Sequence, residues 1–253
     1  CTLWFDHHIT NTTPQFDRPI MPGKGGFRLA PSAARVVCEY YTETAAAGPE
    51  GAARLAFLNS DRMTHLLHEA DRIDAGKLNR DDVLNPQGYV LISMTTDGRN
   101  AGDEPYWLRV IKLLREATLE EMLEDSEVRR RCQRIRDEQE KLRSILLERA
   151  TLKGNIIYVD LRGIDAVPEG NRFLIFTLFP TSNIQVKVAY DSQRENTTAI
   201  SVGYNIFNTT SNVNVGELLK KYGGGGHKVV GSCRVPNDKA EQAIREIVAA
   251  VTE

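Results

Sequence analysis

The stretch Trp4-Phe5-Asp6-His7-His8 puts an Asp-His-His triplet directly after a short apolar run at the beginning of the chain. The run predicts a buried β-strand, so the triplet falls where the strand gives way to a loop. In open α/β sheets, ligands bind at this carboxyl end of the strands. Two adjacent histidines alone are often a chance event, but an aspartate directly before them favours a site.

A second stretch near the other end of the chain, Gly223-Gly224-Gly225-Gly226-His227, strengthens this prediction. A glycine run exposes backbone N–H groups and lets a ligand come close, which suits phosphate oxygens or a ribose. Residues 214–234 carry four basic side chains and one acidic side chain, so the run lies in a locally basic segment. The alternative is a helix end followed by a flexible loop, which needs fewer than four glycines.

The composition is that of an ordinary globular protein of 253 residues, 41% of them hydrophobic and 26% charged, which is long enough for two domains. The formal net charge of −2 gives no indication of a protein that coats a nucleic-acid backbone, so any polyanion site must be a local basic patch. The 4 cysteines are far apart and form no C-x-x-C pair, which predicts free thiols in a reducing cytoplasm. No run approaches the roughly 20 apolar residues of a membrane span, so we expect a cytoplasmic protein without a membrane partner.

Helical patterns dominate the chain from residue 32 to residue 152. Ser32 has the features of an N-cap for a helix that runs to about Thr44, and residues 54–70 predict a second helix. Residues 107–152 contain no proline or glycine and are rich in Leu, Glu and Arg. Within them, a seam of residues spaced by three, four or seven positions predicts packing against another helix: Val128, Cys132, Ile135, Leu142 and Leu146.

After residue 154 the sequence changes to β-branched and aromatic runs. Residues 156–159, 173–176, 184–190 and 198–202 predict strands, and residues 215–222 predict a helix before the glycine run. A strand over 229–235 and an amphipathic helix over 238–251 complete a compact α+β domain with a mixed sheet. We therefore expect a first domain over residues 1–115, a helical connector over 116–152 and a second domain over 153–253.

In this order, at opposite ends of one chain, the Asp6-His7-His8 triplet and the Gly223–His227 signature resemble the DHH phosphoesterase superfamily. In that family a catalytic domain with the triplet is followed by a smaller DHH-associated domain with a GGGH signature. The resemblance covers most of the chain and implies an α/β fold. Its parts would be the C-terminal part of a parallel-sheet catalytic domain, a long helical connector, and a smaller α+β domain with a mixed sheet. Family members carry two acidic motifs before the triplet, so we expect this sequence to begin part-way through the catalytic domain.

The resemblance also implies roles for individual residues. His7 would bind a metal ion, His8 would face the scissile phosphate, and Asp6 would accept a hydrogen bond that orients a histidine ring. Asp71 matches the fourth acidic motif of the family, a ligand to one metal ion, and Asp74 is the second choice. The alternative for both aspartates is a solvated helix end.

The implied cofactor is a pair of Mn²⁺ ions, with Co²⁺ or Mg²⁺ as alternatives. Neutral imidazole is a good ligand for Mn²⁺, and carboxylates bridge pairs of divalent ions. Two such ions can clamp a phosphoryl group and neutralise the leaving oxygen. In the second domain, Gly224, Gly225, Gly226 and His227 would hold the far end of the substrate.

Three further features favour structural explanations. His65 and His68 lie three apart on one predicted helix without a partner at matching spacing, so we expect surface or packing histidines. The arginines at 129–131 are flanked by acidic residues, which predicts a solvated, salt-bridged helix face. The stretch Pro22–Gly26 lacks the spacing of a phosphate loop and is predicted to be an ordinary loop.

We interpret the chain as a metal-dependent phosphoesterase that hydrolyses phosphodiester bonds of short oligonucleotides or (cyclic) dinucleotides, as in the nanoRNase branch of the superfamily. A basic segment without a long basic groove favours short substrates. One alternative is an exopolyphosphatase: polyphosphate needs charge alone, whereas a nucleotide needs a stacking platform such as Tyr204 or Phe207. The other is a nucleotide- or RNA-binding module without catalysis. The helical seam also suggests a homodimer.

Overall fold

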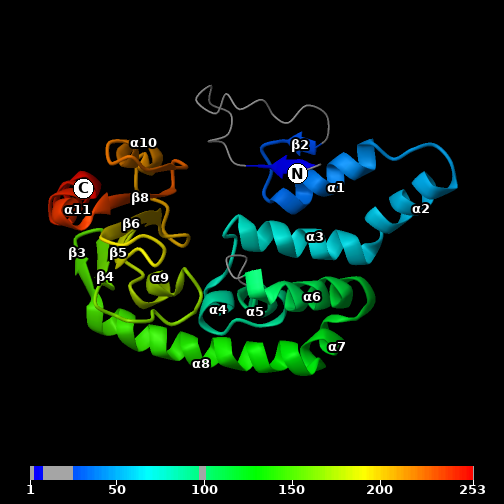
Figure 1. Cartoon of the computed structure of the whole chain (residues 1–253), viewed down its shortest axis with the longest axis horizontal. Coiled ribbons are helices and arrows are strands. Elements are labelled where there is room, and N and C mark those ends of the chain that lie inside the picture. The colour runs from blue at the N-terminus through cyan, green and yellow to red at the C-terminus, as the bar shows by residue number, and fades with distance from the viewer. Residues whose placement is uncertain (1–2, 8–24, 97–100, 253) are drawn as a thin grey trace. The chain divides into compact units, whose positions relative to one another are not determined.

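The structure of the chain, a computed structural model, describes residues 3–7, 25–96 and 101–252, the side chain of Ala101 excepted (Figure 1). The chain divides into two compact units, Cys1–Leu78 and Asn79–Glu253. None of the described helices is long and apolar enough to cross a membrane. The domain boundaries predicted at residues 115 and 152 stay predictions.

The first unit combines a pair of short parallel strands with three helices. The strands are β1 (Trp4–Asp6) and β2 (Gly25–Phe27), and the helices are α1 (Ala33–Glu43), α2 (Pro49–Leu58) and α3 (Asp61–Asp74). α1 begins as predicted, because the Ser32 hydroxyl accepts a hydrogen bond from the N–H of Arg35. Phe5 packs edge-on against Tyr40 with ring centroids 5.1 Å apart, so α1 contacts the strands.

The single helix predicted over residues 54–70 is wrong, since two helices share this segment. The break falls at Asn59, the C-cap of α2, and Ser60, whose hydroxyl accepts a hydrogen bond from the N–H of Met63. A serine favours an N-cap over a helix interior because its hydroxyl competes for backbone groups. Ser60 therefore starts α3 inside an otherwise helical pattern.

The second unit begins with a group of helices. They are α4 (Arg80–Leu84), α5 (Gly88–Met94), the short 3-10 turn η3 (Ala101–Asp103), α6 (Glu104–Glu116), α7 (Leu119–Glu124) and α8 (Ser126–Arg149). Thr118 and Asp125 cap the last two helices with their side chains. The predicted seam along α8 is confirmed, because all of its residues are buried. Val128, Cys132 and Ile135 share one core with residues of α5, α6 and α7, so this part of the seam packs within the chain.

The rest of the second unit is a six-stranded mixed sheet in the order β3-β4-β5-β6-β8-β7. Its strands are β3 (Ala150–Lys153), β4 (Ile156–Asp160), β5 (Ile184–Tyr190), β6 (Thr197–Tyr204), β7 (Gly225–Gly226) and β8 (Val230–Pro236). β4 and β5 are parallel, and the other neighbouring pairs are antiparallel. The predicted mixed sheet is confirmed.

The apolar run 173–176, predicted as a strand, is a helix. It forms α9 (Leu174–Leu178) in the crossover that parallel strands β4 and β5 require. The side chain of Asn171 accepts a hydrogen bond from the N–H of Phe173 just before the helix begins. The prediction was wrong because a short apolar run carries no periodicity that separates a strand from a buried helix.

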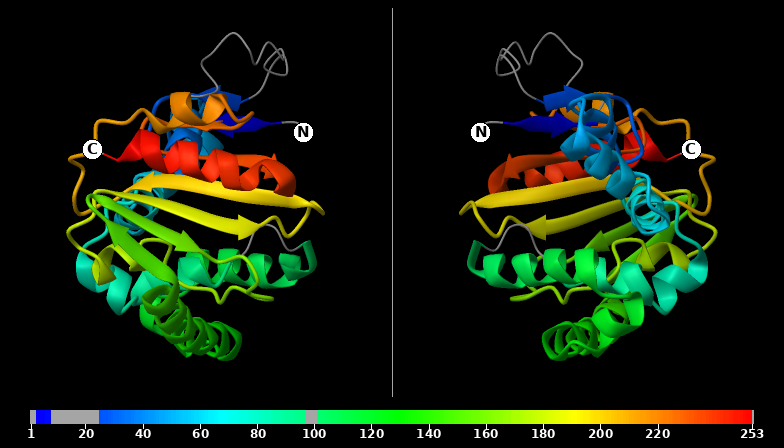
Figure 2. Two further views of the ribbon diagram at one scale, coloured as in Figure 1. Left: turned by 90° about the vertical axis from the view of Figure 1, so that its left-hand side faces the viewer. Right: turned by 90° about the vertical axis from the view of Figure 1, so that its right-hand side faces the viewer.

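Helices cover both faces of the sheet, as Figure 2 shows for α11 on one side of the strands and α8 on the other. α10 (Val215–Lys220) and α11 (Asn237–Val251) share a core with alternate residues of the strands. Members of this core are Ile184, Val186, Val188, Ile200, Val202, Leu219, Ile244 and Ile247. Because side chains alternate along a strand, Gln185 and Lys187 of β5 point to the other face.

Candidate functional site

His7 directly follows β1, and both nitrogens of its ring have partners in the first unit. Nδ1 lies 2.9 Å from the carbonyl oxygen of Ala30, and Nε2 lies 3.3 Å from Oδ2 of Asp74. A carbonyl oxygen only accepts hydrogen bonds, so Nδ1 is the nitrogen that donates. In the neutral ring, Nε2 then presents its lone pair, which is the arrangement of a metal-binding histidine.

Asp74 is the last residue of α3, and Asp71 stands one helical turn before it. Residues three apart on a helix lie on neighbouring parts of its surface, so both carboxylates leave the same side of α3. The side chain of Asp74 is 47% exposed, whereas that of His7 is 13% exposed. The His7–Asp74 pair is therefore open to solvent on the side of its carboxylate.

Asp71 ties α3 to the start of α1. Its Oδ1 accepts a hydrogen bond of 2.7 Å from the hydroxyl of Ser32, and its Oδ2 accepts one of 2.8 Å from Nε of Arg35. The Nη2 group of Arg35 donates to the same Oδ2. The Asp71 carboxylate raises the pKa of the Arg35 guanidinium above its ordinary value. Both carboxylate oxygens of Asp71 are thus held in place by the residues that begin α1.

Asp6 fixes the backbone around the histidine. Its carboxylate is buried, and Oδ1 accepts a hydrogen bond of 2.7 Å from the N–H of His7. Its carbonyl oxygen accepts another from the N–H of Arg28, which extends the pairing of β1 with β2. Asp6 therefore restrains His7 through the main chain.

The His7–Asp74 pair fits part of a metal site, because an imidazole lone pair and a carboxylate oxygen are ligand types that Mn²⁺ accepts. Over residues 3–7, 25–96 and 101–252, no group of three or more His, Cys, Asp or Glu side chains is arranged to hold an ion. The pair would therefore need additional ligands. His8, predicted to face the scissile phosphate, lies outside the described residues.

Three of the four glycines in the run 223–226 are required by the fold. Gly223 has a φ of +70°, in the left-handed region that ends a helix. A Cβ on Gly224 would lie 2.3 Å from the carbonyl oxygen of Ser232, and one on Gly226 would lie 2.3 Å from that of Val230. The chain that follows α10 therefore lies against β8 at a distance that only glycine allows.

Gly225 differs from its neighbours. A Cβ added there meets nothing within 4 Å, and its φ is not among the positive values of the described residues. The residue pairs with Ser232 across the β7–β8 ladder and otherwise presents bare backbone. Gly225 is thus the position in the run where the absence of a side chain leaves space for something outside the chain.

The backbone of His227 is held on both sides. Its N–H donates to the carbonyl oxygen of Val230 at 2.7 Å, and its carbonyl oxygen accepts from the N–H of Gly216 at 3.0 Å. Its side chain is half-buried. Beneath the loop, burial raises the pKa of the Cys233 thiol to about 11, so that thiol stays protonated and unreactive near neutral pH.

Comparisons with known proteins found relatives only among solved structures, since no family model and no curated protein matches the chain. PggH from Vibrio cholerae, a pGpG-specific phosphodiesterase, is 26% identical with a TM-score of 0.73; the match covers 98% of this chain and 79% of PggH. A DHH domain described as a member of a ribosomal protein family is 15% identical, with a TM-score of 0.55 and coverage of 80% and 54%. An exopolyphosphatase-related protein from Bacteroides fragilis is 15% identical, with a TM-score of 0.48 and coverage of 98% and 62%.

The chain has the fold of the DHH domain and of PggH, as the resemblance of its sequence to the DHH phosphoesterases implied. PggH, the neighbour at 26% identity, is a phosphodiesterase and therefore a hydrolase. The likeness to PggH extends over nearly the whole chain, whereas the DHH domain at 15% identity shows the fold alone.

Two predictions, surface histidines and a salt-bridged arginine face, are confirmed. His65 and His68 are exposed, and His68 lies 3.5 Å from Glu69. The arginine-rich face of α8 is paired with acids: Arg129–Glu124, Arg130–Glu127, Arg131–Asp103, Arg131–Glu127 and Arg134–Glu169.

Both aromatic residues considered as stacking platforms have contacts with other parts of the chain. Tyr204 is buried in the core, and its hydroxyl donates to the carbonyl oxygen of Val213 at 2.7 Å. The guanidinium of Arg80 lies over one face of the Phe207 ring, 5.2 Å from its centroid. A base that stacks on this face would have to displace Arg80.

Sequence reasoning did not anticipate the two residues that contact Asp71, namely Ser32 and Arg35, and it ranked Asp74 below Asp71. Asp74 had been the second choice as a ligand, yet its carboxylate is the one that lies beside His7. Ser32 was predicted only as a helix cap, and Arg35 was not considered. The one available signal was the Asp71–Asp74 spacing, which places both carboxylates on one side of a helix.

Proposed function

We propose that this chain is a metal-dependent phosphodiesterase that cleaves short oligonucleotides or (cyclic) dinucleotides. The observation that carries the proposal is the orientation of His7: Nδ1 is bound by the carbonyl oxygen of Ala30, and Nε2 faces the Asp74 carboxylate. The pGpG specificity of PggH, whose fold this chain shares at 26% identity, supports a dinucleotide substrate.

In this proposal His7 and Asp74 hold one metal ion, and Asp71 is a ligand oriented by Ser32 and Arg35. A hydrogen-bonded carboxylate is common among metal ligands, because the bond fixes its direction. Asp6 keeps the His7 backbone in place, and His8 faces the scissile phosphate. A pair of Mn²⁺ ions, or Co²⁺ or Mg²⁺, would supply charge to polarise the phosphoryl group and to stabilise the leaving oxygen.

The glycine run would hold the part of the substrate away from the scissile bond. Gly224, Gly225 and Gly226 supply backbone without side chains, and His227 and Lys228 supply donors. The fold does not require a glycine at position 225. We therefore assign Gly225 as the residue whose backbone the ligand approaches most closely. Holding both ends of a substrate lowers the barrier because the reacting groups are already positioned.

The proposal includes two further expectations, a cytoplasmic location and a homodimer. The location is inferred from the cysteines, because Cys38, Cys132 and Cys233 are free thiols, as expected in a reducing compartment. A homodimer would need a face other than the buried seam of α8. Light scattering of the concentrated protein tests the dimer, and a monomeric mass excludes it.

The test of the function is hydrolysis of pGpG by the purified protein with Mn²⁺, followed by chromatography of the products. We expect turnover that chelator abolishes and that His7→Ala reduces to background. His68→Ala is the matched control, because His68 lies on α3 with its side chain 70% exposed and should retain full activity. Turnover that persists in excess chelator contradicts the metal mechanism, and tight pGpG binding without cleavage favours a binding module.

A further inference from the structure

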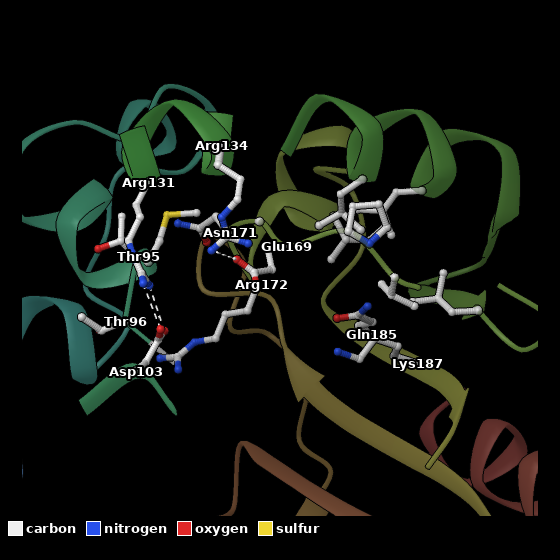
Figure 3. Close-up of a pocket in the computed structure, with 18 of the residues that line it drawn as sticks. Thr95, Thr96, Asp103, Arg131, Arg134, Glu169, Asn171, Arg172, Gln185 and Lys187 are labelled. Atoms are coloured by element: carbon white, nitrogen blue, oxygen red, sulfur yellow. Dashed lines mark hydrogen bonds and ion pairs between the residues drawn. The ribbon is translucent and has the colours of Figure 1, made fainter. Parts of the chain in front are cut away.

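A cavity of about 860 Å³ lies in the second unit, on the face of the sheet opposite α11 (Figure 3). Its walls are α8, the segment 167–175 and strand β5, with residues 94–96 and Asp103 at one end. The volume is within the range of about 300–1,000 Å³ that is typical of small-molecule sites. No residue of the glycine run lines it, so it is separate from the substrate-binding loop proposed above.

The lining of the cavity is strongly basic in a chain whose net charge is −2. Two acidic side chains, Asp103 and Glu169, face five basic ones: Arg130, Arg131, Arg134, Arg172 and Lys187. Basic side chains thus outnumber acidic ones in the lining, and Arg130 and Arg131 also pair with Glu127 outside it. Such a concentration of positive charge around a cavity attracts an anion.

Two of the arginines are held in fixed positions on the α8 wall. Arg131 donates to Asp103 at 2.8 Å, and its guanidinium lies 3.9 Å from the centroid of the Tyr106 ring. Arg134 lies 3.1 Å from Glu169. These contacts orient both guanidinium groups, and Figure 3 draws the two arginines on the α8 side of the cavity, away from β5. A pre-oriented guanidinium loses little entropy when it binds an oxyanion.

The wall opposite α8 adds a lysine from the sheet. Lys187 of β5 is half-buried and lines the cavity beside Gln185, as Figure 3 shows. Arg172, which packs over the ring of Phe173 at 4.7 Å, brings a guanidinium to the same cavity. Positive charge therefore reaches the cavity from the sheet and from the crossover segment as well as from α8, so an anion inside would meet it on more than one side.

The rest of the lining is of a different character. Apolar side chains come from Met94, Leu142, Leu146, Leu161 and Ile175, and amide and hydroxyl groups from Thr95, Thr96, Asn171 and Gln185. Inorganic phosphate alone would leave this apolar part of the cavity unfilled. A ligand that uses the whole site has an anionic end, a flat or apolar body, and polar edges for the amides.

We propose that this cavity binds a phosphate monoester with an organic body, and that a nucleoside monophosphate is the class of ligand that fits it. The phosphate contacts Arg172 and Lys187, and Arg131 and Arg134 add positive charge from the α8 wall. The base and sugar lie against the apolar residues of α8 and α9. No residue assigned to the metal centre or to the glycine run lines this cavity.

The experiment is hydrogen–deuterium exchange of the whole protein with and without GMP, together with calorimetric titration, all in excess chelator. Chelator removes turnover, so the result does not depend on the proposed phosphodiesterase activity. We expect GMP to slow exchange in peptides covering 167–175 and 184–190. Guanosine and inorganic phosphate, titrated separately, should each bind at least about tenfold more weakly than GMP, because each lacks one half of the contacts.

Matched variants locate the binding. Arg172→Gln, at an exposed position, and Lys187→Gln should each weaken GMP binding at least about tenfold and remove the protection of 167–175 and 184–190. His227→Ala, in the glycine run, should leave this protection unchanged. Circular dichroism checks that each variant is folded, and Arg172→Gln remains informative if Lys187→Gln is not.

Four results would overturn the proposal or part of it. One is protection confined to residues 222–231, and another is protection that both cavity variants retain. The third is equal affinity for GMP and guanosine, which would exclude recognition of the phosphate. Equal affinity for GMP and inorganic phosphate would overturn the assignment of an organic body.

Discussion

Nε2 of His7 lies 3.3 Å from Oδ2 of Asp74, and this contact joins the end of β1 to the end of α3. The same ring is bound at Nδ1 by the carbonyl oxygen of Ala30. With one nitrogen occupied by a backbone acceptor, the ring has a single direction in which to present its other nitrogen. The contact therefore makes Asp74, as well as Asp71, a residue whose replacement tests the metal site.

Asp74→Asn should weaken Mn²⁺ binding at least about tenfold and lower pGpG turnover to match, because a neutral amide replaces a charged ligand. Its side chain is 47% exposed, so the melting temperature should change little. Titration calorimetry with Mn²⁺ measures the affinity. Unchanged affinity would remove Asp74 from the site and leave its contact with His7 as a surface ion pair.

Asp71→Asn should have a different signature, because Asp71 holds Ser32 and Arg35 at the start of α1. Weakening these charge-assisted bonds should lower the free energy of unfolding by about 1–3 kcal/mol, as denaturant titration measures. If Asp71 is also a ligand, Mn²⁺ affinity falls as well. Arg35→Met is the matched control, because it removes the guanidinium that binds Asp71 but keeps the Asp71 carboxylate. It should destabilise the protein, with a smaller loss of Mn²⁺ affinity than Asp71→Asn causes.

The glycine run offers a prediction in which neighbouring positions behave oppositely. Gly224→Ala should destabilise the protein by about 1–3 kcal/mol, because its Cβ would lie 2.3 Å from the carbonyl oxygen of Ser232. Gly225→Ala meets nothing within 4 Å and should leave the melting temperature unchanged. It should nevertheless raise KM for pGpG if the substrate approaches the backbone there. Unchanged KM in a stable Gly225→Ala protein would mean that the ligand does not come close at this position.

Glu127 gives a prediction about pH. Hydrogen bonds from Arg130, and then from Arg131, lower the pKa of its carboxyl from 4.5 to about 2. Because the pKa in the folded protein lies below the unfolded value, the stabilisation is fully present above about pH 4.5 and is lost as the pH falls toward 2. Glu127→Gln should therefore lower the melting temperature near neutral pH, and the difference from the parent should shrink between pH 4.5 and 2.

Thermal denaturation at several pH values measures this difference. Glu120→Gln, at an exposed position in the first turn of α7, is the control and should show a smaller effect. A Glu127→Gln difference that stays constant down to the lowest pH at which both proteins fold would contradict the ion-pair explanation.

Local patterns predicted much of the fold because they reflect local causes. Ser32 starts α1 since its hydroxyl caps the helix, and the alternation in 184–190 gives β5 one buried face and one polar face. The same reasoning failed at 173–176, where four apolar residues carry no periodicity, and at Ser60, where a cap interrupts a helical pattern.

The site was less predictable because its contacts join residues far apart in the sequence. Spacing could place Asp71 and Asp74 on one side of a helix, but not decide which carboxylate meets His7. That choice depends on how α3 packs against α1 and the strands. The ion pair between Asp71 and Arg35 helps to fix this packing. The basic cavity was not predictable either, because Arg131, Arg172 and Lys187 come from three separate elements.

The last prediction separates the glycine run from the metal centre. His227→Ala removes a side chain from a loop whose backbone is held by Val230 and Gly216, so the loop should keep its shape. KM for a dinucleotide should rise and kcat should fall, because the substrate is held less well at its far end. Bis-p-nitrophenyl phosphate is too short to use that contact and should be cleaved nearly as fast as by the parent.

His7→Ala provides the contrast, since a metal ligand acts on every substrate: both activities should disappear. Initial rates of the His227→Ala and His7→Ala variants on the dinucleotide and on bis-p-nitrophenyl phosphate show whether the two sites have separate roles. Equal loss of both activities in His227→Ala would mean that His227 acts at the reacting phosphate itself. Loss of only the dinucleotide activity, with a stable fold, would make the glycine run the element that selects nucleotides over other phosphodiesters.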